Sequence, residues 1–321
     1  MNTTKTALRR LAAGAGALAL AMTGAIAAGT AAWAAVGPDQ PGAPSAGTLT
    51  INKYAGDNTD TPNPEDLLDG VEFTVTQVGR LVEGTCTAID LTDAPDWEGL
   101  DDLFASAPDA PATPFCLTSV AQDDVTEDGR VVFDLAVGVY FVQETDPGDN
   151  PIVSVVPNFY VSIPTAEDAD ADGWNYNVVA DPKNQLMDQP SKTIENQTGL
   201  VVGDTVTWTL TVPIPSLNEE DVFESASVTD ALDARLSYAS SSLSIGDTDL
   251  EEGAHYTVDE DVVTWTFVGD GLDLLYDHQG EDMTVTLVTT VDEVGDGSIP
   301  NDDYSSSFND ATVPGQVFPY T

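Results

Sequence analysis

The sequence contains few basic residues. Of its 321 residues, nine are Lys or Arg and 55 are Asp or Glu, which gives a formal net charge of −46. A surface of this sign repels the phosphates of nucleic acids and of anionic membranes, so we expect neither as a partner. The apolar fraction of 41% is ordinary, and it indicates an acidic globular protein rather than a disordered acidic tail.

Long apolar runs are missing beyond the N-terminal region, so no later segment is expected to span a bilayer. The N-terminus itself has the features of a secretory signal. Lys5, Arg9 and Arg10 come first, an apolar run at 11–28 follows, and Ala-Trp-Ala at 32–34 offers a signal-peptidase site. A membrane anchor is the alternative, but the run is rich in weakly apolar Ala and Gly. We therefore predict an exported protein whose mature chain has 287 residues, enough for about two domains.

Histidine and cysteine are also scarce, with two of each. A zinc site needs more ligands than this, no glycine-rich phosphate loop follows an expected strand, and no serine nucleophile elbow is present. We therefore expect no cofactor and no enzyme that turns over a substrate. The enzyme alternative is a secreted hydrolase in which two acids converge in a cleft.

Two further patterns have a chemical interpretation. In an exported chain, Cys86 and Cys116 predict one disulfide, and the alternative is a catalytic thiol assisted by one of the two histidines. The acidic run at 168–173 resembles the start of a calcium loop. However, Val179 stands at the twelfth position, where such a loop needs glutamate. We interpret this run as an acidic hairpin turn and expect no metal, with a cation site as the alternative.

Long helical periodicity is absent, and short alternating segments separated by turn residues predict strands instead. The expected strands are 47–54, 71–78, 130–144 and 158–163 in the first half, and 200–212, 226–228, 243–245, 255–258, 262–267 and 283–291 in the second. One short helix is expected at 97–104. This pattern indicates an all-β fold of tandem immunoglobulin-like β-sandwich domains, with the helix inserted in the first. The expected units are a signal peptide at 1–34, a leader at 35–47, and domains at 48–186 and 187–321.

The mature chain contains three lysines, and their positions are informative. Lys53 lies in the first expected strand of domain one, Lys192 has the equivalent place in domain two, and Lys183 lies between them. A bias toward acidic residues explains the number of lysines but not these positions. A buried lysine with a neutral amine is a nucleophile. Beside an Asn carboxamide and a protonated carboxylic acid, it can form an amide and release ammonia.

Three segments resemble sortase-assembled major pilins of Gram-positive bacteria. Trp174, Val178 and Pro182 with the lysine after it match the pilin motif, although Ala-Asp replaces the usual Val-Tyr before the proline. The segment 139–148 resembles the family's E-box, and residues 192–233 are similar to its isopeptide-forming middle domain. The resemblance covers nearly the whole mature chain.

The resemblance implies roles for the lysine of the pilin motif and for the second domain. Lys183 would accept the bond that sortase makes to the C-terminal sorting motif of a neighbouring subunit; the alternative is a solvated loop lysine. In the middle domain, Lys192, Asp230 and Asn309 would supply the amine, the catalytic acid and the carboxamide. Asn301 is the alternative source of the carboxamide.

In domain one, some family members link the lysine of the first strand to the asparagine that follows the pilin lysine. The matching residues are Lys53 and Asn184, with Glu144 of the E-box as the assisting acid. Other members lack this bond. The alternative role for Glu144 is a carboxylate at a strand end that binds nearby backbone amides.

The function implied is a non-enzymatic, structural subunit of a cell-surface pilus, stabilised by self-formed Lys–Asn bonds. Its partners would be identical subunits in a head-to-tail fibre, a pilin-specific sortase, and a host surface to which the fibre adheres. The family normally continues into a third domain, a sorting signal, a hydrophobic span and a basic tail. The chain stops at 317–321 without them, and we interpret it as a fragment. A surface adhesin, with 86–116 as the binding insertion, is the alternative function.

Overall fold

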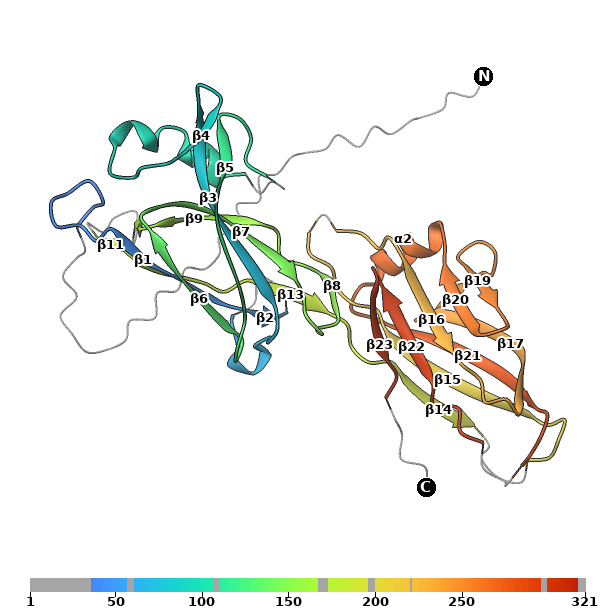
Figure 1. The fold of residues 1–321 in the computed structure, drawn as a ribbon. Helices are drawn as coiled ribbons and strands as arrows, with labels where there is room; N and C mark the ends of the chain where they lie inside the picture. Colours follow the sequence, from blue (N-terminus) through green and yellow to red (C-terminus); the bar gives the residue numbers. More distant parts are fainter. Residues whose placement is uncertain are drawn as a thin grey trace, which may run out of the picture.

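The computed structural model describes residues 36–56, 61–106, 110–166, 173–195, 200–219, 221–295 and 299–316. The expected signal peptide, almost all of the acidic run at 168–173 and the C-terminal residues 317–321 lie outside these ranges. Figure 1 shows two lobes in sequence order, an N-terminal lobe that contains β1 to β13 and a C-terminal lobe that contains β14 to β23. Both are built mainly from strands, so the expected all-β fold is confirmed.

Two sheets enclose the core of the N-terminal lobe. In one, β1 (Ala46–Asn52) lies between β12 (Asn177–Ala180), which is parallel to it, and the antiparallel β6 (Arg130–Ala136). The other contains, in order, β4 (Thr85–Ala88), β3 (Glu72–Val82), β7 (Gly138–Asp146) and β9 (Phe159–Ile163), and β5 (Phe115–Val125) also pairs with β3. Leu49, Phe73 and Phe133 are at most 2% exposed because alternate side chains of these strands face the shared core.

Smaller sheets complete this lobe. The strand β13 (Lys183–Leu186) lies between β2 (Tyr54–Ala55) and β8 (Ile152–Ser154), and β10 (Thr165–Ala166) pairs with β11 (Trp174–Asn175). The 3₁₀ helix η1 (Pro64–Asp66) follows β2. The chain thus enters the lobe on β1 and β2 and leaves it on β13, directly beside β2.

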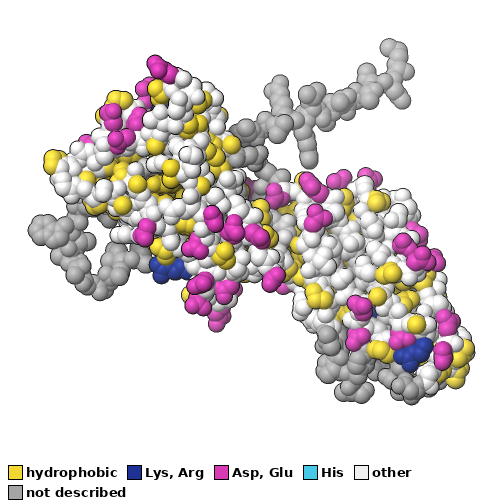
Figure 2. Space-filling view, viewed as in Figure 1, with side chains coloured by type: hydrophobic (Ala, Val, Ile, Leu, Met, Phe, Trp, Pro, Cys, Tyr) yellow, Lys and Arg dark blue, Asp and Glu magenta, His cyan; other side chains and the backbone are white. Residues whose placement is uncertain are grey.

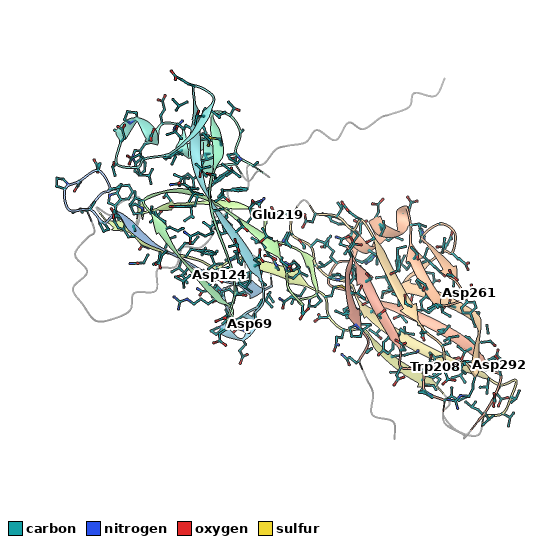
Figure 3. The ribbon with its side chains drawn as sticks, in the orientation of Figure 1. Asp69, Asp124, Trp208, Glu219, Asp261 and Asp292 are labelled. Atoms are coloured by element: carbon teal, nitrogen blue, oxygen red, sulfur yellow. A yellow bond between two sulfur atoms is a disulfide. The ribbon has the colours of Figure 1, made fainter. Side chains whose placement is uncertain are left out.

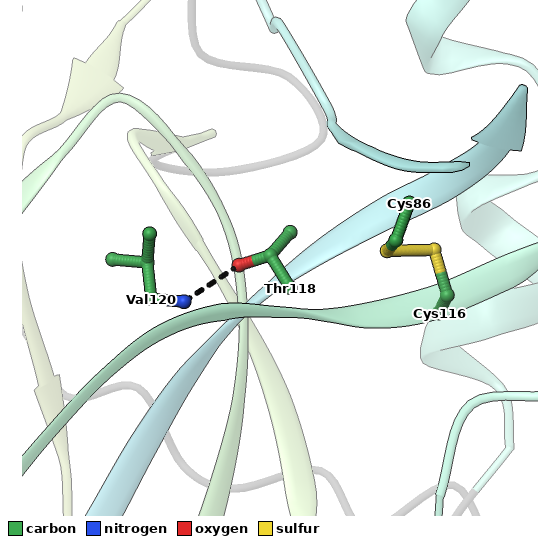
Figure 4. The surroundings of a disulfide bond; sticks show 4 residues. All are labelled: Cys86, Cys116, Thr118 and Val120. Carbon is green, nitrogen blue, oxygen red and sulfur yellow. Dashed lines mark hydrogen bonds between the residues drawn. A yellow bond between two sulfur atoms is a disulfide. The ribbon is translucent and has the colours of Figure 1, made fainter.

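An excursion between β4 and β5 carries the 3₁₀ helix η2 (Ala94–Trp97) and the helix α1 (Leu100–Phe104). Cys86 on β4 and Cys116 on β5 form a disulfide, with Cα atoms 6.0 Å apart (Figure 4). The bond closes this excursion beside β3, with which both strands pair. The predicted disulfide is therefore confirmed.

The C-terminal lobe is a sandwich of two antiparallel five-stranded sheets. One contains, in order, β14 (Ser191–Glu195), β15 (Thr205–Pro213), β21 (Asp282–Val291), β17 (Leu236–Ile245) and β18 (Thr248–Leu250). The other contains β19 (Tyr256–Asp259), β20 (Val263–Phe267), β16 (Ala226–Asp230), β22 (Tyr304–Phe308) and β23 (Ala311–Pro314). Leu210, Val285 and Trp265 are fully buried between the sheets.

The structure corrects several of the expected elements. The segment expected as one strand at 130–144 is two strands, β6 and β7, and the strand expected from residue 200 begins only at Thr205. The polar strand β5 was not expected, and neither was the helix α2 (Asp270–Asp277) in the C-terminal lobe. None of the helices in the described parts of the chain could cross a bilayer.

The lobes touch at β8 and at the residue that follows β13. Val153 and Met187, from the N-terminal lobe, pack against the core of the C-terminal lobe. Ser154 Oγ bonds to the carboxylate of Asp221 and accepts a bond from the backbone N–H of Asn218 at 3.1 Å.

Acidic side chains are scattered over both lobes on the face drawn in Figure 2, and the basic side chains there are few.

Candidate functional site

Three predicted residues of the N-terminal lobe meet in its interior. Lys53 lies between β1 and β2, Glu144 is on β7, and Asn184 is on β13. The Lys53 Nζ atom donates to Asn184 Oδ1 at 2.6 Å and lies 2.9 Å from Glu144 Oε2. The Asn184 Nδ2 atom donates to the other carboxylate oxygen, Glu144 Oε1, at 2.6 Å. The carboxylate therefore contacts both the amine and the amide nitrogen that the amine would displace.

The environment of this cluster lowers the pKa of its amine. Lys53 and Asn184 are fully buried, and the side chain of Glu144 is 2% exposed. Burial lowers the pKa of Lys53 from 10.5 to about 8, although the charge of Glu144 opposes the shift. Near neutral pH a substantial minority of such amines is uncharged and nucleophilic. Glu144 binds two side chains, so the alternative in which it binds only backbone amides is wrong.

One contact of this cluster comes from a backbone group. The backbone N–H of Val156, in the segment between β8 and β9, donates to Asn184 Oδ1 at 2.7 Å. This bond is aimed at the carbonyl oxygen of the carboxamide. Because every residue except proline carries a backbone N–H, no sequence pattern could have identified this donor.

A second cluster lies in the C-terminal lobe. The Nζ atom of Lys192, on β14, lies 2.5 Å from Asp230 Oδ2 on β16 and 2.9 Å from the backbone carbonyl oxygen of Asn301. It also lies 4.8 Å from the ring centre of Trp208 and 5.2 Å from that of Tyr304. Figure 3 shows Trp208 on β15, beside β14. The amine is thus enclosed by two aromatic rings and an acid.

Burial shifts both partners of this pair toward their uncharged forms. It lowers the pKa of Lys192, with the charge of Asp230 as the main opposing effect. Burial also raises the pKa of Asp230, against the effects of Lys192 and of the Asn301 carboxamide. Asn301 is 4% exposed, and its Oδ1 atom has no hydrogen-bond partner among the described residues. An amine, an acid and a carboxamide therefore lie together.

The structure does not bring Asn309 to this cluster. Its Oδ1 atom accepts from the backbone N–H of Glu224 at 2.7 Å, and its Nδ2 atom donates to the Val222 carbonyl oxygen at 2.9 Å. Asp230 pairs with the first residue of β22, whereas Asn309 follows the last. At about 3.3 Å per residue, the strand separates them by more than 10 Å. The preference for Asn309 over Asn301 is therefore corrected.

The residues of the predicted pilin motif make specific contacts within the lobe. The ring of Trp174 packs edge-on against Trp97 at 5.5 Å between centroids, and Val178 is buried on β12 opposite Leu49. The Pro182 carbonyl oxygen accepts a bond from the Tyr54 N–H at 3.1 Å. These contacts fix the strand that leads into β13.

Lys183 is the first residue of β13 and is 4% exposed. It lies in a strand beside Tyr54, and the alternative of a solvated loop lysine is therefore wrong. Its neighbour Asn184 enters the buried cluster. Since successive side chains of a strand point to opposite faces, Lys183 points away from that cluster.

Comparisons with known proteins agree with the arrangement of these elements. Residues 182–303 match the family model described as the Sgo0707 N2 domain. The chain is 32% identical to fimbrial subunit type 2 of Actinomyces naeslundii, over 93% of this chain and 59% of that protein. It is 30% identical to fimbrial subunit type 1 of Actinomyces viscosus, over 63% of this chain and 38% of that protein.

A solved structure shows the same fold. The full-length major pilin SpaD from Corynebacterium diphtheriae superposes with a TM-score of 0.57 at 25% identity, and the match covers 84% of this chain and 65% of that one. The chain spans less than two thirds of the length of each of these relatives.

Proposed function

Because the chain is a homologue of Gram-positive fimbrial subunits and shares the fold of a major pilin, we propose that it is a structural subunit of a covalently polymerised pilus on the cell surface. The observation that carries this proposal is the convergence of Lys53, Glu144 and Asn184 in the N-terminal lobe. These residues lie far apart in the sequence, and their meeting matches the chemistry that a self-crosslinking fibre subunit needs.

The N-terminal lobe forms an amide between Lys53 Nζ and the Asn184 side chain, with release of ammonia. Glu144 contacts both nitrogens and moves the proton between them. The bond replaces a buried charged amine, which is costly, with a neutral amide. It also joins the first strands of the lobe to β13, its last.

The C-terminal lobe forms the equivalent bond between Lys192 and Asn301, promoted by Asp230. The proximity of Lys192 to both residues supports this assignment, as does the burial of all three. The bond would join the first strand, β14, to the residues that immediately precede β22. Tension on a fibre then cannot separate the first strand from the rest of the lobe. Resistance to forced unfolding depends on the unfolding rate, and such a bond lowers that rate.

Lys183 is the residue that accepts the sortase-made bond to the next subunit. When Lys53 and Lys192 have been consumed, it is the last lysine side-chain amine in the mature chain, which contains three lysines. A transpeptidase that requires such an amine then has one position to use. The partners of this reaction are a pilin-specific sortase and an identical subunit.

An intact-mass measurement tests the crosslinks. The mature chain, residues 35–321, is expected to weigh less than its sequence by two molecules of ammonia after its disulfide has been reduced. Lys53→Ala and Lys192→Ala should each abolish one deficit, and the control Lys183→Ala should keep both. A native chain without any ammonia deficit would refute self-crosslinking.

A further inference from the structure

The carbonyl oxygen of Asn184 already has a hydrogen-bond donor that belongs to neither reacting group. The Val156 N–H lies 2.7 Å from Asn184 Oδ1, and Val156 is only 4% exposed. The distance is within the range of a good N–H to oxygen bond. A buried donor at this position acts in a low dielectric environment, where its effect on a developing charge is large.

Formation of the crosslink creates negative charge at this oxygen. The lone pair of a neutral Lys53 Nζ attacks Asn184 Cγ, and the carbonyl electron pair moves onto Oδ1. Glu144 takes one proton from Nζ and delivers it to Nδ2. The carbonyl then re-forms, the Cγ–Nδ2 bond breaks, and ammonia leaves. The amine and the carboxamide thus become a secondary amide and ammonia, and Glu144 is restored as a carboxylate.

We propose that the backbone N–H of Val156 is the oxyanion donor for this reaction. The inference rests on the proposed crosslinking function and adds a catalytic group to it. Glu144 serves the two nitrogens, and the Val156 N–H serves the oxygen. Each atom whose charge or protonation changes therefore has a partner before the reaction starts.

The C-terminal lobe holds this donor in place. The Val156 N–H and the Val155 carbonyl belong to the same peptide unit, and Asn218 Nδ2 donates to that carbonyl at 2.9 Å. In a trans peptide the two groups point in opposite directions, so this bond fixes the plane that aims the N–H at Asn184. A hydrogen bond to the carbonyl also polarises the N–H of the same unit. Asn218 is therefore a positioning residue for the reaction in the other lobe.

The two lobes differ in this respect. No donor within the described ranges reaches the Asn301 carbonyl oxygen, Oδ1, and that lobe instead has an acid with a raised pKa. The crosslink of the C-terminal lobe is therefore an internal control that does not depend on Val156.

The experiment measures crosslink formation during refolding. The mature chain is denatured in urea directly from inclusion bodies, diluted into native buffer and quenched in acid at increasing times. Digestion at glutamate followed by mass spectrometry quantifies each crosslinked peptide separately. Two variants are Val156→Pro, which removes the N–H of residue 156, and Val156→Ala, which keeps it. A third chain has an ester in place of the amide between Val155 and Val156, which removes the N–H and also makes the Val155 carbonyl a weaker acceptor for Asn218. The fourth is Asn218→Ala, which removes only the bond to that carbonyl.

The ester and Val156→Pro chains should form the N-terminal crosslink about 100-fold more slowly, the usual effect of losing one oxyanion donor. Val156→Ala should stay close to the native rate, and Asn218→Ala should slow the reaction by less than the ester. The C-terminal crosslink and the disulfide should form normally in all of them, which shows that the chains fold.

Two results would overturn the inference: an ester chain that crosslinks at the native rate, or a Val156→Ala chain that is slowed as much as the ester. Failure of the proposed function has a different signature, because then the native chain forms no Lys53–Asn184 crosslink at all.

Discussion

The rate of the Lys53–Asn184 crosslink should depend on pH through the amine. Burial lowers the pKa of Lys53 to about 8, and a lysine below its pKa is protonated and cannot attack. If Glu144 reacts as a carboxylate, the rate follows the fraction of neutral amine. It should then fall about tenfold per pH unit below about pH 8, to about 1% of its maximum near pH 6, and level off above about pH 9.

The refolding assay measures this profile directly. Tryptophan fluorescence in the same samples reports the folding rate, so that a pH effect on folding is not mistaken for one on the chemistry.

In the C-terminal lobe, burial shifts Lys192 and Asp230 toward an uncharged pair, and this pair carries the same number of protons as the ion pair. Its crosslink should therefore depend less on pH over the same range.

Two outcomes would refute this reasoning for Lys53. A midpoint near 10.5 would show that the amine reacts from an exposed, unperturbed state. A rate that is flat below pH 8 and falls above it would show that Lys53 first passes its proton to Glu144. The neutral pair that then reacts carries the same number of protons as the ion pair, so its population does not change until a proton is lost.

The remaining predictions concern the carboxamide donor, the acceptor and the disulfide. In intact-mass measurements, Asn301→Ala should abolish the ammonia deficit of the C-terminal lobe and Asn309→Ala should keep it. The reverse result would show that Asn309 supplies the carboxamide. Lys183→Arg should abolish attachment of a sorting-motif peptide by a pilin sortase, and product on another residue, located by peptide mapping, would contradict the assignment. Replacing Cys86 and Cys116 by serine should destabilise the N-terminal lobe by about 3.5 kcal/mol in urea unfolding, because the two residues are 30 positions apart. A change below about 1 kcal/mol would show that this loop is already constrained without the bond.

The strand β13 carries a residue of each of the two proposed bonds. Asn184 faces the crosslink, and Lys183, one residue earlier, faces away from it. Closure of the Lys53–Asn184 amide would therefore rigidify the strand that carries the proposed acceptor. Such a strand would transmit load from the proposed inter-subunit bond into the lobe without separating from β2.

Much of the fold could be predicted because alternating hydrophobicity reports a strand with one buried face. The strand β6, in which buried and exposed residues alternate strictly, is an example. The strand β5 could not be recognised because its last seven residues are all exposed and carry no such alternation. The helix α2 has only eight residues, about two turns, which is too few for a helical period to stand out from the background.

The sequence alone singled out three lysines, because the mature chain contains only these three and they stand at repeated positions and beside recognisable motifs. The structure buries all three. It could not decide between Asn301 and Asn309, since both flank the same strand and only the pairing of β22 with β16 places one of them beside Lys192. The tertiary structure also decided the donor to Asn184. Every residue except proline carries a backbone N–H, so the sequence does not mark this donor. Its direction depends on a peptide plane that is held by Asn218, a residue of the other lobe 63 positions from Val155.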